Sequence, residues 1–166
     1  MLHELQGWHD FYILIGTASA TLIGLMFVAA SVGASVFNAD REAPLRALLT
    51  PTVVHFGVVL AACLAGMVPA LTRASLGALL IVIGLVGVAF ALRAGLNLLR
   101  RWGGSATKDW EDELFYGYVP IAAHLALIAA GIVTLIRPAL GLDILAGTLV
   151  ALLLLGIHNA WDMTLW

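Results

Sequence analysis

The sequence predicts an all-α membrane protein, a polytopic bundle of five transmembrane helices. Its 166 residues are 62% hydrophobic and 11% charged, whereas soluble domains are about half apolar and about a quarter charged. Such a chain cannot cover a water-facing surface with polar groups, so lipid must be its solvent. The apolar residues also form continuous runs that match the roughly 20 residues a helix needs to cross a bilayer, without the alternation of membrane strands.

Charges or helix breakers bound every predicted span. The links between consecutive spans read NADREAPLR, TR, RRWGGSATKDWEDE and RPALGLD. The second and fourth links are short enough to permit only tight helical hairpins. We therefore expect residues 1–166 to form a single integral membrane domain with no soluble domain appended. The predicted spans are residues 11–37, 47–71, 74–99, 114–136 and 142–161.

Positive charge is distributed unequally between the two ends of this bundle. The end with the N-terminus would carry only Arg73 and Arg137. By the positive-inside bias, the N-terminus is expected outside, and the first link, the third link and the C-terminus in the cytoplasm. The cytoplasmic end would carry Arg41, Arg46, Arg93, Arg100, Arg101 and Lys108.

Composition also excludes several classes of function. The net charge is −2 and there is no basic tail, which argues against nucleic acid as a partner. Cys63 is the only cysteine, so one chain can form neither a disulfide framework nor a cysteine metal site. We find no nucleophile–base pair, phosphate loop or acid pair, and therefore expect a non-enzymatic role.

Small residues recur at helical spacing in every span, and in lipid such stripes allow helices to approach closely. The first span offers Thr17, Thr21, Gly24 and Ser31. This stripe is either a packing seam of the bundle, an oligomer interface or the lining of a hydrated path, although hydroxyls also bond back to their own helix. Five helices with such stripes have more packing surface than one bundle buries, so we expect a homo-oligomer or a subunit of a membrane complex.

The stretch FYILIGTASATLIGLMFVAASV in the first span resembles the first helix of a family of small bacterial membrane proteins. That helix reads F-Y-x-L-x-G-x-A-A-x-T-L-x-G-L-x-F-V-A. Phe11, Tyr12, Gly16 and Thr21 match it here, and Ser19 departs from it. The resemblance covers one helix of five and implies a bacterial inner-membrane protein. Some members are labelled modulator of the FtsH protease, which implies regulation of a membrane protease.

Three histidines lie within predicted spans. His55 is roughly 12 Å and His124 roughly 15 Å from the cytoplasmic start of its span, and His158 is near the cytoplasmic end of its own, at 1.5 Å of rise per residue. All three therefore belong to the inner half of the bilayer. Ionisable residues within spans usually face the bundle interior and mark functional pathways.

Three chemistries fit this convergence. His158 and Asp162, an i, i+4 pair, could join His55 or His124 as ligands of a transition metal. Alternatively, His55 and His124 could bind a haem iron from both sides, with room made by nearby glycines. In the third case the histidines relay or sense protons. A purely structural role also fits, with His158, Asn159 and Asp162 as a satisfied polar helix end. The glycines expected to make room for haem are Gly57, Gly66, Gly117 and Gly131.

The remaining charges near the spans allow two interpretations each. Arg93 would extend its side chain to the cytoplasmic interface or pair with Asp162. Glu111 and Glu113 would form a solvated helix start, or, in a symmetric oligomer, a ring attracting cations to a pore mouth.

Together these observations predict an oligomeric ion- or proton-conducting assembly or an accessory subunit of a membrane complex. A metal- or haem-binding protein using His55, His124 and His158 is the first alternative. A regulator of a membrane protease is the second.

Overall fold

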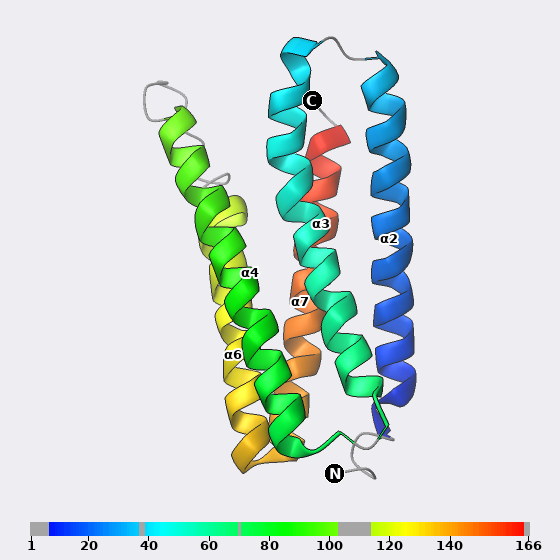
Figure 1. Ribbon diagram of the computed structural model, residues 1–166, viewed down its shortest axis with the longest axis vertical. Coiled ribbons are helices and arrows are strands. Elements are labelled where there is room, and N and C mark those ends of the chain that lie inside the picture. The colour runs from blue at the N-terminus through cyan, green and yellow to red at the C-terminus, as the bar shows by residue number, and fades with distance from the viewer. Residues whose placement is uncertain (1–6, 37–38, 70, 103–113, 165–166) are drawn as a thin grey trace.

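The computed structural model is helical along nearly the whole of the described chain (Figure 1), which comprises residues 7–36, 39–69, 71–102 and 114–164. Five helical segments are long and apolar enough to cross a membrane. This confirms the predicted all-α bundle of five spans. The elements are α2 (His9–Val36), α3 (Ala39–Met67), α4 (Arg73–Trp102), the π-helix η1 (Leu114–Tyr118) continued by α6 (Val119–Ile136), and α7 (Pro138–Thr164).

Two predicted links are shorter than expected. The link before the fifth span was predicted to run to residue 141, but α7 begins at Pro138, directly after Arg137. Proline suits a first helical position because its missing N–H needs no partner there. α6 ends where the Arg137 backbone leaves the helical region, at φ −132° and ψ 82°, although its N–H still donates to the Val133 carbonyl at 2.7 Å. Likewise α3 begins at Ala39, so most of the predicted first link is helical.

Four of the helices surround a common interior. α4 packs against α3 and α6, and α7 packs against the same two helices. α3 and α6 therefore lie diagonally across the bundle (Figure 1). α2 lies outside this group and packs mainly on α3, where the Ser19 hydroxyl donates to the Phe56 carbonyl at 2.6 Å.

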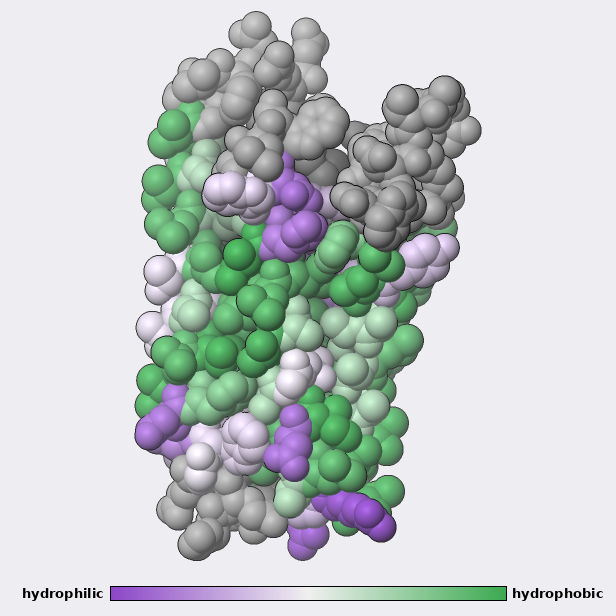
Figure 2. Space-filling model, turned by 180° about the vertical axis from the view of Figure 1, so that it is seen from behind, coloured by the Kyte–Doolittle hydropathy of each residue, from purple (hydrophilic) through white to green (hydrophobic). Residues whose placement is uncertain are grey.

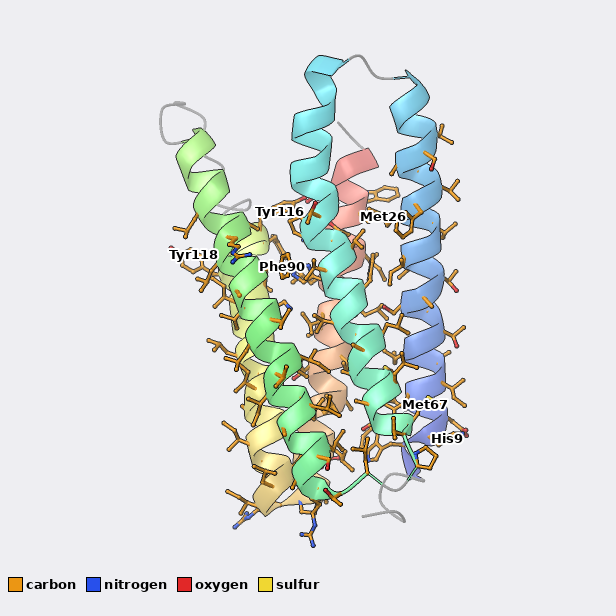
Figure 3. All side chains as sticks on the ribbon, viewed as in Figure 1. His9, Met26, Met67, Phe90, Tyr116 and Tyr118 are labelled. Atoms are coloured by element: carbon orange, nitrogen blue, oxygen red, sulfur yellow. The ribbon has the colours of Figure 1, made fainter. Side chains whose placement is uncertain are left out.

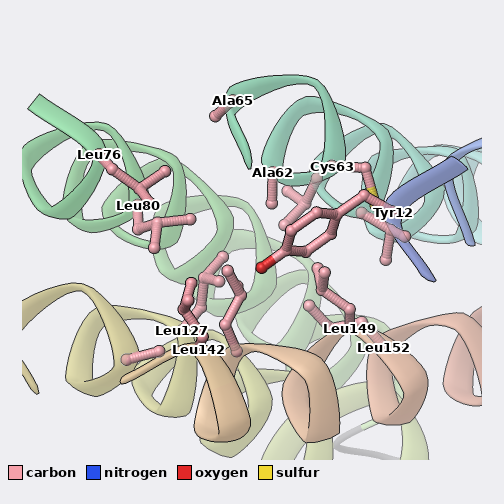
Figure 4. Close-up of a cluster of buried hydrophobic side chains, with 14 residues drawn as sticks. Tyr12, Ala62, Cys63, Ala65, Leu76, Leu80, Leu127, Leu142, Leu149 and Leu152 are labelled. Carbon is pink, nitrogen blue, oxygen red and sulfur yellow. The ribbon is translucent and has the colours of Figure 1, made fainter. Parts of the chain in front are cut away.

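Leucines fill the interior of the bundle half that lies near the first turn of α2. Tyr12 extends from α2 into this leucine cluster (Figure 4), and Gly66 makes room for its ring. A Cβ on Gly66 would lie 3.0 Å from Cε2 of that ring. The cluster leaves this half of the bundle interior densely apolar. Its leucines are Leu76, Leu80, Leu127, Leu142, Leu145, Leu149 and Leu152.

The outer surface suits lipid. Hydrophobic residues cover the middle of the face in Figure 2, while hydrophilic residues lie mostly toward its two ends. Large apolar side chains are exposed, such as Leu14 and Phe27 on α2 and Leu154 on α7. The first turn of α2 and the last turn of α7 lie at opposite ends of the bundle (Figure 1), as an odd number of crossings requires. The chain is thus a multi-pass membrane protein.

Glycines bring α4 and α6 close together. A Cβ on Gly77 would lie 2.8 Å from the Gly131 carbonyl oxygen, and one on Gly131 would lie 2.8 Å from that of Gly77. Further along, a Cβ on Gly84 would lie 2.6 Å from Cγ1 of Ile128. The small-residue stripes predicted in these two spans are therefore packing seams within the chain.

Candidate functional site: a buried histidine pair

The second and fourth spans bring two histidines together inside the bundle. His55 on α3 is 2% exposed and His124 on α6 is 0% exposed. Their ring centroids are 5.4 Å apart, with the ring planes at 51°. The two residues were predicted to lie at similar depth. They meet across the bundle diagonal, which places both rings in the common interior of four helices.

Both rings are oriented by the same local contact. Nδ1 of His124 lies 2.6 Å from the Pro120 carbonyl oxygen, and Nδ1 of His55 makes the same bond to the Pro51 carbonyl. A carbonyl oxygen can only accept, so each Nδ1 carries the hydrogen and donates it. In the neutral ring, Nε2 is then left with an unprotonated lone pair.

The two Nε2 atoms have no hydrogen-bond partner among the residues that the structure describes. Buried polar atoms are almost always partnered, because leaving one unpaired in an apolar interior costs free energy. Two adjacent imidazoles that both present a free lone pair are suited to binding a species that accepts electron pairs. The site therefore has the chemistry of an electron-pair donor.

Gly87 of α4 creates the space that the His124 ring occupies. A Cβ at that position would lie 1.8 Å from Cδ2 and 2.4 Å from Nε2 of the ring. No side chain larger than hydrogen fits there while the ring stays in place. Gly87 therefore leaves the room that the Cδ2 and Nε2 atoms of His124 occupy.

His158 and Asp162 form a separate pair. Nε2 of His158 lies 3.5 Å from Oδ2 of Asp162, and these side chains are 42% and 33% exposed. The His158 ring packs against Phe115 of η1, with centroids 4.1 Å apart. Consecutive helical residues point about 100° apart, so His158 turns toward η1 while its neighbour Asn159 is buried.

The predicted metal set of His158 and Asp162 with His55 or His124 is therefore not assembled. Within the described ranges, no group of three or more His, Cys, Asp or Glu side chains could hold a metal ion. The space predicted for haem is also partly filled. Gly66 accommodates the Tyr12 ring and Gly131 contacts α4, whereas Gly57 and Gly117 have no atom within 4 Å of a built Cβ.

The predicted stripe on the first span faces outward. Thr17, Thr21, Gly24 and Ser31 are all exposed on α2. Thr21 donates to the Thr17 carbonyl and Ser31 donates to that of Phe27, both at 2.8 Å. These hydroxyls are satisfied within their own helix, so the stripe is not a packing seam within the chain.

Arg93 is exposed on α4. Its predicted partner Asp162 lies beside His158 instead. Glu111 and Glu113 lie outside the described residues. Tyr116 and Tyr118 of η1 point in different directions, Tyr116 toward α3 and Tyr118 to the outer surface (Figure 3).

Two contributors to the site were not predicted, Gly87 and Pro51. The signal for Pro51 is a spacing that the chain uses twice, PTVVH in the second span and PIAAH in the fourth. In each, the histidine follows proline by one helical turn. Gly87 follows Gly84 by three residues and so continues the glycine face of α4.

Comparison with known proteins identifies no relative of this chain. The chain matches no family model, and neither a curated protein nor a solved structure is detectably similar to it. The resemblance of the first span to the family containing FtsH modulators stays a prediction.

Proposed function

We propose that this membrane protein is non-enzymatic and binds a transition-metal ion between His55 and His124. The observation that carries the proposal is the pair of buried, adjacent rings whose Nε2 atoms have no partner among the described residues. In helical bundles, ligand and metal sites are built from inward side chains on facing helices. Imidazole suits zinc, copper, iron and nickel, and the proposed ions are of this class.

The spacing of the two rings supports a shared ion. With a metal–nitrogen distance of about 2.0 Å, two imidazoles have centroids about 6 Å apart at a linear ion and about 4.5 Å apart at a right angle. The observed 5.4 Å lies between these limits. Two histidine ligands would leave further coordination positions of such an ion open.

The orientation of the two Nε2 lone pairs is set by the hydrogen bonds that the Nδ1 atoms of the same rings donate. A metal-binding histidine usually donates its other ring N–H to a carbonyl or carboxylate, and this fixes the ring. Here the Pro51 and Pro120 carbonyls accept those bonds. The rings are thus oriented for Nε2 ligation before an ion arrives.

The structure of a single chain gives less support to ion or proton conduction than to metal binding. The leucine cluster fills the interior between the histidine pair and the end of the bundle near the start of α2. A polar path through one chain would have to cross it. A path between chains of an oligomer, a role as an accessory subunit, and regulation of a protease remain the alternatives predicted from the sequence.

The test is metal binding to the purified protein in mild detergent after treatment with a chelator. Zinc(II) and copper(I) are titrated against chromophoric chelators of known affinity. We expect about one ion per chain, lost in His55→Leu and in His124→Leu and retained in the control His158→Leu, whose histidine lies outside the pair. Wild-type protein that binds neither ion would overturn the proposal. A haem absorption band in the protein as isolated would show that the pair binds haem and not a separate metal ion.

A further inference from the structure

Besides His55, His124 and the Tyr12 hydroxyl of the leucine cluster, Asn159 of α7 also has buried side-chain polar atoms without a hydrogen-bond partner among the described residues. It is 0% exposed, and neither Oδ1 nor Nδ2 has a hydrogen-bond partner within the part of the chain described. A carboxamide offers two acceptor lone pairs and two donor hydrogens. In an apolar interior, leaving all of them unpaired is costly, so a bound species is expected to satisfy them.

The register of α7 on α3 places Asn159 at the level of the histidine pair. A Cβ on Gly156 would lie 2.5 Å from Cε1 of Phe56, the residue next to His55. α3 and α7 run in opposite directions (Figure 1). The turn of α7 that follows Gly156 therefore lies beside the turn of α3 that precedes Phe56, and these turns contain Asn159 and His55.

The helix face of Asn159 points to the shared interior. Leu152 lies seven residues earlier, two turns along the same face, and belongs to the central leucine cluster. Leu153 and Ala160 pack with Phe56 on the side of α2. Asn159 is thus turned away from α2 and toward the space between α3 and α6.

We infer that Asn159 is a further metal-site residue, which binds a water molecule that occupies an open coordination position of the ion held by His55 and His124. The inference rests on the proposed function. No direct hydrogen bond joins the Asn159 amide to Nε2 of His55 or of His124, and polar groups that do not bond directly are often linked by a bridging water. The water oxygen ligates the ion while its hydrogen is donated to Oδ1 of Asn159.

Two substitutions at this position should change zinc affinity in opposite directions. Asn159→Leu removes the polar partner while keeping the volume similar, and we expect zinc affinity to fall about 10- to 100-fold, as for other outer ligand contacts. Asn159→Asp places a negative charge beside a cation whose two histidine ligands are neutral, and we expect affinity to rise at least about tenfold. Thr148→Val is the control, because Thr148 is a buried polar residue of the same helix that bonds only to the Ile144 carbonyl in its own turn.

Zinc(II) affinity is measured by chelator competition, and cobalt(II) is used as a second probe because its visible absorption reports coordination number. We expect the cobalt spectrum to change in Asn159→Leu and not in Thr148→Val. If wild-type protein binds zinc through both histidines but the two Asn159 variants keep its affinity and spectrum, the inference is wrong and the proposed function stands. If wild-type protein binds no ion, both are wrong.

Discussion

Replacing Gly87 with alanine tests whether the position of the His124 ring matters. The added Cβ would lie 1.8 Å from Cδ2, whereas ordinary contact begins at 3.4 Å, so the two atoms must separate by 1.6 Å. The ring cannot turn away freely, because its Nδ1 is bonded to the Pro120 carbonyl at 2.6 Å. Either that bond breaks or α4 moves away from α6.

The energetic cost follows from the same geometry. Overpacking a buried contact costs about 1–3 kcal/mol, while alanine in place of a helical glycine returns at most about 1 kcal/mol. We therefore expect a lower midpoint of thermal unfolding for metal-free Gly87→Ala in detergent. Because Nε2 of His124 is displaced, zinc affinity should also fall at least about tenfold, as it does when the contacts that orient a metal ligand are lost.

The matched controls are Gly24→Ala on α2 and Gly147→Ala on α7, where an added Cβ meets no atom within 4 Å. Both should keep the wild-type zinc affinity and unfold at the wild-type temperature or above it. Wild-type zinc affinity in Gly87→Ala would show that this glycine does not position the His124 ring.

Three further substitutions test the packing that holds the site. Ser19→Ala removes the hydrogen bond from α2 to α3. We expect it to lower the free energy of unfolding by about 0.6 kcal/mol, the average for side-chain hydrogen bonds between membrane helices. Ser31→Ala is the control in the same thermal unfolding assay and should be neutral, because its hydroxyl bonds within its own helix. Gly156→Ala would place its Cβ 2.5 Å from an aromatic carbon of α3, and we expect a loss of about 1–3 kcal/mol. Leu149→Ala in the leucine cluster should cost about 2–5 kcal/mol and the exposed Leu154→Ala far less; equal losses at these two leucines would contradict the assignment of the interior.

The sequence is enough to predict the number of helices, because long apolar runs have no other solution in lipid. Helix ends are less well predicted. Residues 138–141 contain a proline and a glycine and read as a link, yet Pro138 opens α7 and Gly141 packs against Thr134. Gly141 lies in a helical turn because α6 approaches it so closely at Thr134 that a larger side chain would clash.

Depth along the bilayer can be counted from the sequence, but direction around the helix depends on which helices become neighbours. His55 and His124 were predicted to lie at similar depth, and they meet. His158 was grouped with them by depth, but it faces η1, where Phe115 packs on its ring. In the same way the hydroxyl stripe of the first span faces outward, because Tyr12 and Ser19 form the contact with α3 instead.

Metal binding by the histidine pair requires that both Nε2 atoms be unprotonated, so the protonation state of the two buried rings is decisive. Nitrogen NMR of protein labelled in its five histidines, assigned with the His55→Leu and His124→Leu variants, distinguishes a protonated ring nitrogen from a free one. We expect that, without metal, both rings carry hydrogen on Nδ1 and none on Nε2, and that zinc(II) shifts both Nε2 signals together. Hydrogen on Nε2 of either ring, or Nε2 signals that do not respond to zinc, would contradict metal binding by the histidine pair.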